Sequence, residues 1–510
     1  MTTFDAKPAG SPPAGANDRR ALAIVGAFLA ARLVFAILLG PGVDESYTLA
    51  ISRTLSLSYF DHPPLHQWVA HFAALALGEG IGARLPFVAL FAATGWLIYL
   101  MTRDLFGREA AVVALFCFNV APFFFASAGT WVLPDGPLLF GLALAAFALV
   151  RLFFGEEGGR SWRLWLLAGA GFGLAGLSKY SAALTVAGLA AFLALVPDQR
   201  RGLKHPAPYV AAALAAAMVA PVFVWNARHG WVSFAFQGSR GAPAAFRPVQ
   251  GAQMALGEIV YLFPWLFAAL AASLFAAFRK RRDKRQLLLL CLALPSIVVF
   301  SLTPFWGGRG LPQWTMPGWL FAFPLLGAWV KERGFWRGTL RAWALVSAGV
   351  LAAAVAVVTV QARTGWPLRL FPAARAIPDP TLEAFSWDGL RKAPLFDPPP
   401  AFVVAAKWSD AGKIALALGP GVPVFVISDD PRGWAFVDGR SNLVGRNGVV
   451  VVRSSDQAVA KALAAPLFQS QAAPRNLSLT RNGYPEIELA LIPAMGLKRE
   501  LPPPYPGPRR

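Results

Sequence analysis

Near the amino terminus, residues 21–48 read ALAIVGAFLAARLVFAILLGPGVDESYT. From residue 21 to residue 40 every side chain is apolar except that of Arg32, and a helix of about 20 apolar residues spans the hydrocarbon core of a bilayer. The acidic pair Asp44 and Glu45 follows directly. Because a carboxylate is costly to hold beside hydrocarbon, an acidic pair at the end of a membrane span indicates a functional site.

Similar apolar stretches recur as far as residue 361. We predict spanning helices at residues 21–40, 83–101, 110–126, 136–154, 164–178, 181–197, 207–225, 254–278, 286–304, 311–330 and 338–361. The two short stretches between 164 and 197 leave one alternative open, a single long tilted span.

The composition agrees with an integral membrane protein. Of the 510 residues, 56% are hydrophobic and 15% charged, and the mean hydropathy is +0.50. The net charge of +20 raises the question of nucleic acid, but the cations lie mostly in short loops between apolar stretches, as in cytoplasmic anchors. We therefore expect no nucleic-acid partner. Cys117 and Cys291 lie inside apolar stretches and predict packed thiols.

The loop charges predict the orientation. With the amino terminus in the cytoplasm, every alternate loop is basic, including the run RKRRDKR at 279–285. A single span at 164–197 would move that run to the outer face, so the charge pattern favours two spans. We expect a multi-pass protein of the bacterial inner membrane.

This orientation brings four motifs to the outer face, all at the ends of apolar stretches. We predict helices lying in the interface at 48–57 and 65–77, separated by Pro63-Pro64. The motifs are Asp44-Glu45-Ser46-Tyr47, Tyr59-Phe60-Asp61-His62-Pro63-Pro64-Leu65, Pro134-Asp135-Gly136-Pro137-Leu138 and Ser178-Lys179-Tyr180.

Beyond residue 362 the pattern changes to short apolar runs separated by Pro and Gly. Strands are predicted at 402–406, 422–427, 449–452 and 487–492, with a helix at 409–418 between the first two. We therefore predict a helical membrane domain at 19–361, followed by a small α/β domain outside the membrane at 362–497. Residues 1–18 and 498–510 are predicted to be disordered.

Taken in order, these motifs resemble those of bacterial family 39-type glycosyltransferases, over residues 40 to 260. That family includes protein O-mannosyltransferases and the aminoarabinose and galacturonic acid transferases that modify lipid A or core oligosaccharide. The resemblance implies a glycosyltransferase C superfamily fold and inverting transfer of one sugar from a polyprenyl-phosphate donor. It also implies a site facing the periplasm, with a glycan, a lipid or a protein as the acceptor.

By this resemblance Asp44 is the general base, and Glu45 supports its orientation or the acceptor. Inverting transfer needs a base near the acceptor hydroxyl and positive charge near the departing phosphate. Asp135 is implied as a second carboxylate of the site. Helix capping is the structural alternative for Asp44 and for Asp135.

The resemblance also assigns residues to phosphate and to a divalent cation. His62, Lys179 and Arg240 are implied as donor-binding residues, and Asp61 with His229 as metal ligands. Three alternatives stay open: Asp61-His62 as a surface turn, Lys179 as a snorkelling lysine, and Gln237 at the place of the metal-binding histidine. Arg32, inside the first span, is expected to pair with an internal carboxylate or carbonyl.

Two other classes of function compete with the transferase. A flippase for lipid-linked sugars would place charges near the midplane, on broken helices in repeated halves, whereas here they gather at one edge without a visible repeat. A structural partner protein would carry carboxylates without catalytic use.

Overall fold

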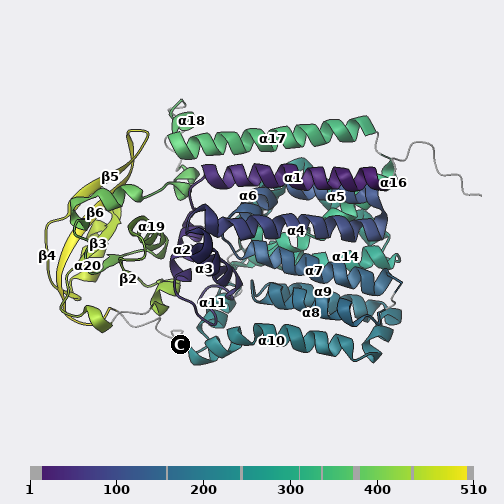
Figure 1. Ribbon diagram of the computed structural model, residues 1–510, viewed down its shortest axis with the longest axis horizontal. Helices are drawn as coiled ribbons and strands as arrows, with labels where there is room; N and C mark the ends of the chain where they lie inside the picture. The colour runs from purple at the N-terminus through teal and green to yellow at the C-terminus, as the bar shows by residue number, and fades with distance from the viewer. Residues whose placement is uncertain are drawn as a thin grey trace, which may run out of the picture.

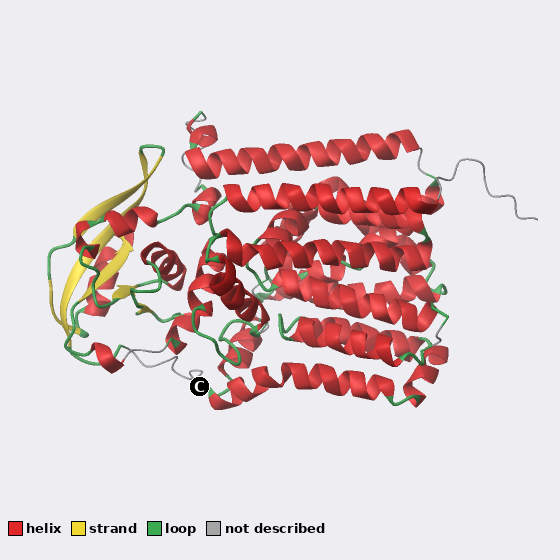
Figure 2. Cartoon of the chain, viewed as in Figure 1, coloured by secondary structure: helices red, strands yellow, loops and turns green. Residues whose placement is uncertain are grey.

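The computed structural model describes residues 14–156, 159–241, 245–308, 310–334, 337–370, 379–437 and 441–501. Long helices form a bundle, and a smaller α/β domain with a sheet covers one end of it (Figure 1 and Figure 2). The predicted fold class is confirmed. The predicted disorder of residues 1–18 is wrong in part, because a helix begins at Ala14, while residues 1–13 and 502–510 lie outside the described residues.

The helices of the bundle follow the apolar stretches closely. Six are long and apolar enough to cross a membrane, and three further candidates are helix pairs with a sharp bend. The bundle contains α1 (Ala14–Leu38), α4 (Ile81–Phe106), α5 (Arg108–Val120), α6 (Pro122–Thr130), α7 (Asp135–Phe154), α8 (Trp162–Gly176), α9 (Ala182–Leu195), α10 (Ala207–Arg228), α12 (Pro248–Leu262), α13 (Pro264–Arg279), α14 (Lys284–Leu302), α15 (Met316–Trp319), α16 (Ala322–Arg333) and α17 (Arg337–Thr364).

Two predicted spans are bent, each where a proline begins the second half. The chain turns by 72° between α5 and α6, before Pro122, and by 101° between α12 and α13, before Pro264. Proline has no backbone N–H to continue the preceding helix. The stretch at 164–197 forms two helices, α8 and α9, as the charge pattern favours.

Close packing of α7 against α8 fixes the level of the break that follows α8. A Cβ on Gly141 would lie 2.6 Å from the backbone oxygen of Gly171, so only glycine permits this approach. Such small-residue contacts are the usual way for membrane helices to pack tightly. As a result the start of α7, at Asp135, and the α8–α9 turn, at Lys179, lie at the same end of the bundle.

The basic loops meet at the other end. Their ion pairs join loops distant in sequence: Arg108 with Asp18 at 3.4 Å, Arg151 with Asp104 at 3.0 Å, Lys284 with Asp198 at 2.9 Å, and Lys280 with Glu332 at 2.5 Å. Exposed ion pairs contribute less than about 1 kcal/mol each to stability. They matter here because they show which loops lie at the same end of the bundle. The loops predicted to share one membrane face do share one end of the bundle.

Three short helices cover the opposite end, next to the α/β domain: α2 (Val43–Ser52), α3 (Leu65–Leu77) and α11 (Val232–Arg240) (Figure 1). The helix predicted at 65–77 is confirmed. The one predicted at 48–57 is misplaced, because the helix already begins at Val43 and ends at Ser52. The acidic pair thus occupies the first turn of α2, where negative charge is favourable. Helix α11 was not predicted.

The α/β domain contains a six-stranded mixed sheet, in the order β2-β1-β3-β6-β4, with β5 also paired to β6. Strand β1 is parallel to β2 and β3, whereas β6 is antiparallel to its neighbours. The elements are α18 (Trp366–Arg369), β1 (Val403–Ala405), α19 (Trp408–Leu418), β2 (Val424–Val426), β3 (Gly448–Arg453), α20 (Gln457–Ala464), β4 (Phe468–Gln471), β5 (Arg475–Arg481) and β6 (Tyr484–Leu497).

Both faces of the sheet are covered. Val403 and Val449 belong to a cluster with residues of α19 and with Tyr47 of α2, while Val404 and Val450 pack with residues of α20 on the other face. Helix α19 therefore lies between the sheet and α2. This contact joins the α/β domain to the end of the bundle that carries the predicted motifs.

Candidate active site

The side chains of the acidic pair, Asp44 and Glu45, point in different directions from the first turn of α2. Successive helical residues point about 100° apart, so Asp44 and Glu45 cannot face the same way. Asp44 is exposed, whereas Glu45 keeps only 1% of its exposure. Of the two, only Asp44 is accessible to a substrate.

Glu45 and Arg84 form a buried ion pair, here called the clamp, which joins α2 to α4. The two carboxylate oxygens of Glu45 accept bonds from Arg84 of α4 at 2.7 and 2.5 Å, and from the backbone N–H of Val132 at 3.1 Å. Arg84 also donates to the carbonyls of Ala36 and Leu39, at 2.6 and 2.7 Å. These contacts tie α2 to α1 and α4, which agrees with a supporting role of Glu45 in the orientation of Asp44 and places its carboxylate away from an acceptor. Sequence reasoning missed Arg84, although a cation just inside an apolar span was a signal.

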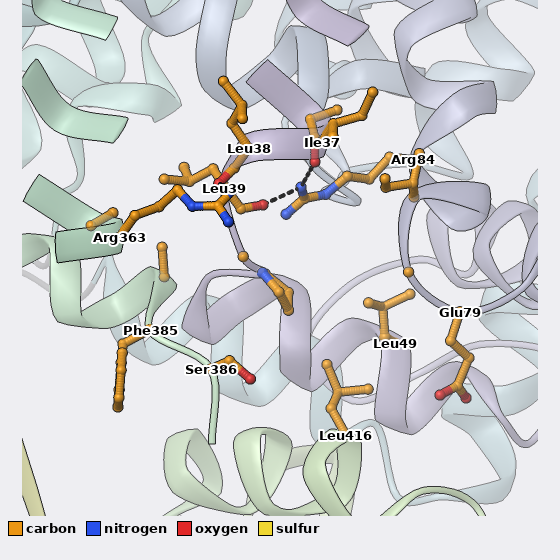
Figure 3. Close-up of a pocket in the computed structure, with 17 residues that line it drawn as sticks. Ile37, Leu38, Leu39, Leu49, Glu79, Arg84, Arg363, Phe385, Ser386 and Leu416 are labelled. Carbon is orange, nitrogen blue, oxygen red and sulfur yellow. Dashed lines mark hydrogen bonds between the residues drawn. The ribbon is translucent and has the colours of Figure 1, made fainter. Parts of the chain in front are cut away.

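A cavity of about 510 Å³ lies beside this clamp and is distinct from the surroundings of Asp44. Figure 3 shows Arg84 bonded to carbonyls in its wall, with Leu49, Arg363 and Ser386 nearby. Among the described lining residues, none is Asp44, Asp61, Asp135 or Lys179.

Asp135 and Lys179 form a buried ion pair. Lys179 Nζ lies 2.9 Å from Asp135 Oδ1, and both residues keep less than a tenth of their exposure. The backbone N–H of Leu65 donates to the carbonyl of Leu177, which ties the α8–α9 turn to the start of α3. The pairing shows that Lys179 is held by a carboxylate and does not snorkel to the surface.

Asp61 is buried between the two domains. Its Oδ2 accepts a hydrogen bond from the Tyr47 hydroxyl, and its backbone carbonyl accepts one from Gln237 Nε2 at 2.6 Å. Its other carboxylate oxygen, Oδ1, is buried without a hydrogen-bond partner among the described residues. Burial, the largest influence, raises the pKa of Asp61 to about 6, against the lowering effect of Arg432.

His62 is buried next to His66, with 5.8 Å between the ring centroids. Burial and the positive charge of Lys179 hold the pKa of His62 well below 6.5, and burial lowers that of His66 to about 3. Both imidazoles are therefore neutral at pH 7. The direction of this shift favours the neutral form of His62, which offers a hydrogen bond and no positive charge.

Arg240 ends α11 with its guanidinium stacked on aromatic rings, 4.5 Å from the ring centre of Trp314 and 5.4 Å from that of Phe236. Its charge lowers the pKa of both Asp44 and His62. The predicted donor-binding residue is thus near both.

Arg432 reaches the same place from the α/β domain. Its Nη1 lies 4.0 Å from Asp61 Oδ1, and its guanidinium lies 4.0 Å from the ring centre of Trp408. Among the charges that lower the pKa of Asp44, that of Arg432 is the largest. Sequence reasoning missed this residue because nothing in its local sequence links it to motifs almost four hundred residues away.

Asp44 lies among these groups. Loss of hydration raises its pKa, Asp135 raises it further, and Arg432, Lys179 and Arg240 lower it. The structure therefore brings Asp44, Asp61, His62, Asp135, Lys179 and Arg240 to one place and adds Arg432. A carboxylate with weakened hydration next to several cations suits proton abstraction beside an anionic leaving group.

The predicted metal ligands are not assembled as a site. His229 stacks on Trp225, with ring centroids 4.1 Å apart, and its Nδ1 lies 2.7 Å from the Trp225 carbonyl. Gln237, the alternative ligand, is bonded to the Asp61 backbone. Within the part of the chain that the structure describes, no three His, Cys, Asp or Glu side chains gather to hold a metal ion.

Arg32 has the structural role expected of it. Inside the bundle it donates to Asn119 Oδ1 at 2.9 Å and to the Phe125 carbonyl at 3.3 Å, and it stacks 4.3 Å from the ring centre of Phe91.

The fold has close counterparts among solved structures. Crystal structures of ArnT from Cupriavidus metallidurans, bound to undecaprenyl phosphate and in the apo state, match with TM-scores of 0.62 and 0.60. Each match has 16% sequence identity and covers 92% of this chain and 97% of ArnT. The helical bundle and the small α/β domain thus have the fold of the glycosyltransferase C type.

Sequence comparison adds a matching family model and a curated relative to these structural neighbours. Residues 61–225 match the family model of dolichyl-phosphate-mannose-protein mannosyltransferases. The lipid A galacturonosyltransferase RgtD of Rhizobium johnstonii is 27% identical over 273 residues, which are 51% of this chain and 54% of RgtD. The chain thus aligns with about half the length of this curated relative. Together these findings show that the chain is similar to membrane glycosyltransferases of the family 39 type, the family that its motifs resemble.

Proposed function

We propose that this protein transfers one sugar from a polyprenyl-phosphate carrier to a hydroxyl of an acceptor of the lipid A type. Transfer takes place with inversion at the periplasmic face of the bacterial inner membrane. The observation that carries the proposal is Asp44: an accessible carboxylate with a raised pKa, within the fields of Lys179, Arg240 and Arg432. The similarities to RgtD and to ArnT bound to undecaprenyl phosphate support the acceptor and the carrier.

In this mechanism Asp44 removes the proton from the acceptor hydroxyl. The acceptor oxygen bonds to the anomeric carbon, and the bond from that carbon to the phosphate oxygen breaks, so that the carrier leaves as polyprenyl phosphate. Lys179 and Arg240 stabilise the charge on the departing phosphate, while Asp135 fixes the position of Lys179. Neutral His62 contributes a hydrogen bond to the donor.

The orientation follows from the charges of the loops. The ion-paired basic loops lie at the end of the bundle opposite to the site, and basic loops favour the cytoplasm. This supports a periplasmic site.

A single carboxamide substitution tests the base. In Asp44→Asn the side chain cannot accept a proton, so we expect transfer to fall by about 10²- to 10⁴-fold. Transfer is measured by mass spectrometry with the protein in liposomes, using polyprenyl-phosphate-linked galacturonic acid and lipid A. The matched control is Asp198→Asn, the same change at the opposite end of the bundle.

Unchanged transfer by the Asp44→Asn variant would refute the assignment of the base. The flippase alternative gives a different result: carrier-linked sugar crosses the bilayer of liposomes without acceptor, and no glycosylated lipid A forms.

Metal removal gives a second test. Because the described donors do not assemble a metal site, no step of the mechanism passes through a divalent cation. We expect transfer in excess EDTA to stay within about twofold of the untreated rate, since the cations at the site belong to side chains. Loss of transfer in EDTA, restored by one divalent metal, would contradict this.

A further inference from the structure

One residue of the α/β domain, Arg432, is placed against the site, and the transfer described above assigns it no contact with the donor or the acceptor. Arg432 enters from the loop after β2, and its backbone is in the left-handed region, with a φ of 49°. The next residue, Gly433, donates its N–H to the Tyr47 hydroxyl at 2.8 Å, and Tyr47 in turn donates to Asp61. The loop is thus tied to α2 at the point where Arg432 meets Asp61.

Aromatic rings hold the Arg432 guanidinium in place, but most of its N–H groups have no hydrogen-bond partner among the described residues. It packs between rings, 4.0 Å from the centre of Trp408 and 5.7 Å from that of Phe236, and its side chain keeps 22% of its exposure. Among the described residues its hydrogen bonding is limited to a 3.5 Å contact from Nε to Asp430. Nη1 lies 4.0 Å from Asp61 Oδ1, which is beyond hydrogen-bonding distance.

The facing carboxylate oxygen is also unused. Asp61 keeps only 5% of its exposure, and its Oδ1 has no hydrogen-bond partner among the described residues. A buried acceptor without a donor is costly, and a fork of N–H donors prefers a carboxylate or phosphate. Such a pair is satisfied by a ligand that offers a hydroxyl to Asp61 and an anionic group to Arg432.

We propose that Arg432 and Asp61 recognise the sugar of the donor. Arg432 selects a uronic acid by binding its carboxylate, and Asp61 accepts a hydrogen bond from a ring hydroxyl. This rests on the proposed transfer. A pyranose with a carboxylate at C6 carries both groups on one ring. In the proposed transfer Lys179 and Arg240 hold the carrier phosphate, which leaves Arg432 for the sugar.

The test compares two donors in each variant. kcat/KM is measured with polyprenyl-phosphate-linked galacturonic acid and with polyprenyl-phosphate-linked galactose, on the same lipid A acceptor. In Arg432→Gln we expect uronosyl transfer to fall about 10- to 100-fold, because a hydrogen-bonded charge is lost, and galactosyl transfer to change by less than about threefold. Arg432→Lys, which keeps the charge without the fork, should be intermediate.

The matched control is Arg453→Gln. Arg453 is another arginine of the same domain, stacked 5.6 Å from the ring centre of Trp387 and paired with Asp410 at 3.0 Å, and its loss should leave the ratio of the two donors unchanged. Thermal unfolding confirms that each variant is folded.

The outcomes separate the two proposals. If Arg432→Gln lowers both donors equally, or the wild type prefers galactose, the selection of a uronic acid is overturned while the transferase stands. If the wild type transfers neither sugar to lipid A, the proposed function fails with it.

Discussion

At the residue scale, neighbours in sequence have separate roles here. Asp44 and Glu45 are adjacent, yet one is accessible and the other is bonded to Arg84 inside the protein. Asp61 and His62 likewise differ: the aspartate faces Arg432, and the imidazole lies beside His66. A motif read from sequence therefore identifies the place of the site more reliably than the role of each member.

The proposed role of Asp44 as the base gives a prediction on the pH dependence of transfer. The Asp44 carboxyl must be deprotonated to act as a base, and loss of hydration raises its pKa above 3.8, so kcat/KM should fall on acidification at a higher pH than for a fully hydrated aspartate. Asp135 raises this pKa and Arg432 lowers it. The acidic limb should move to lower pH in Asp135→Asn and to higher pH in Arg432→Gln.

The measurement is the pH profile of kcat/KM between pH 4 and 8 with saturating acceptor, a range spanning the ordinary carboxyl and histidine pKa values of about 4 and 6.5. Asp198→Asn serves as the control that should not shift the limb. Shifts in the same direction for both variants would show that another group controls the profile.

At the element scale, short and broken helices place the reacting groups. Helix α2 begins at Val43, directly after a Gly-Pro-Gly turn, so its first turn presents Asp44. The break between α8 and α9 places Lys179 beside Asp135. In both cases a functional side chain lies at an element end, where the backbone leaves the bundle.

The clamp between α2 and α4 gives a prediction on stability. Glu45→Gln leaves Arg84 as an uncompensated buried charge, and breaking a buried pair in this way costs about 3–5 kcal/mol. Glu79→Gln removes the partner of Arg53 in a partly exposed pair and should cost less than about 1 kcal/mol. Unfolding in detergent micelles measures both; equal costs would show that the clamp does not hold α2.

At the scale of the whole molecule, the site is shared by two domains. The bundle supplies Asp44, Asp135 and Lys179, and the α/β domain supplies Arg432. The two domains meet where α19 contacts α2. Near this contact Lys413 Nζ donates to the carbonyl of Pro41 at 2.5 Å. Docking of the α/β domain is therefore a condition for a complete site.

A glycine substitution tests this docking. A Cβ at Gly412 would lie 2.7 Å from the backbone N of Tyr47, so Gly412→Val should push α19 away from α2 and withdraw Arg432. We expect transfer to fall at least about tenfold, since misplacing a site by 1 Å costs up to about 10². The control is Gly421→Val, in the same domain, where no atom lies within 4 Å.

Limited proteolysis reports docking apart from activity. The Gly412→Val variant should be cleaved faster between the domains, and Gly421→Val should match the wild type. An active, protease-resistant Gly412→Val variant would show that the two domains work independently.

The sequence by itself determined the membrane fold, the separate α8 and α9, and the gathering of Asp44, Asp61, Asp135 and Lys179 at one end. These follow from hydropathy and loop charge, which are local properties of the chain. It also predicted the strand regions of β1, β2, β3 and β6, but the polar strands β4 and β5 gave no apolar run to detect.

Tertiary structure alone decided which groups can react. It paired Glu45 with Arg84, buried His62 beside His66, stacked His229 on Trp225 and brought Arg432 to Asp61. The physical reason is that hydration and ion pairing depend on what surrounds a side chain in space. For this site those surroundings come from segments hundreds of residues apart.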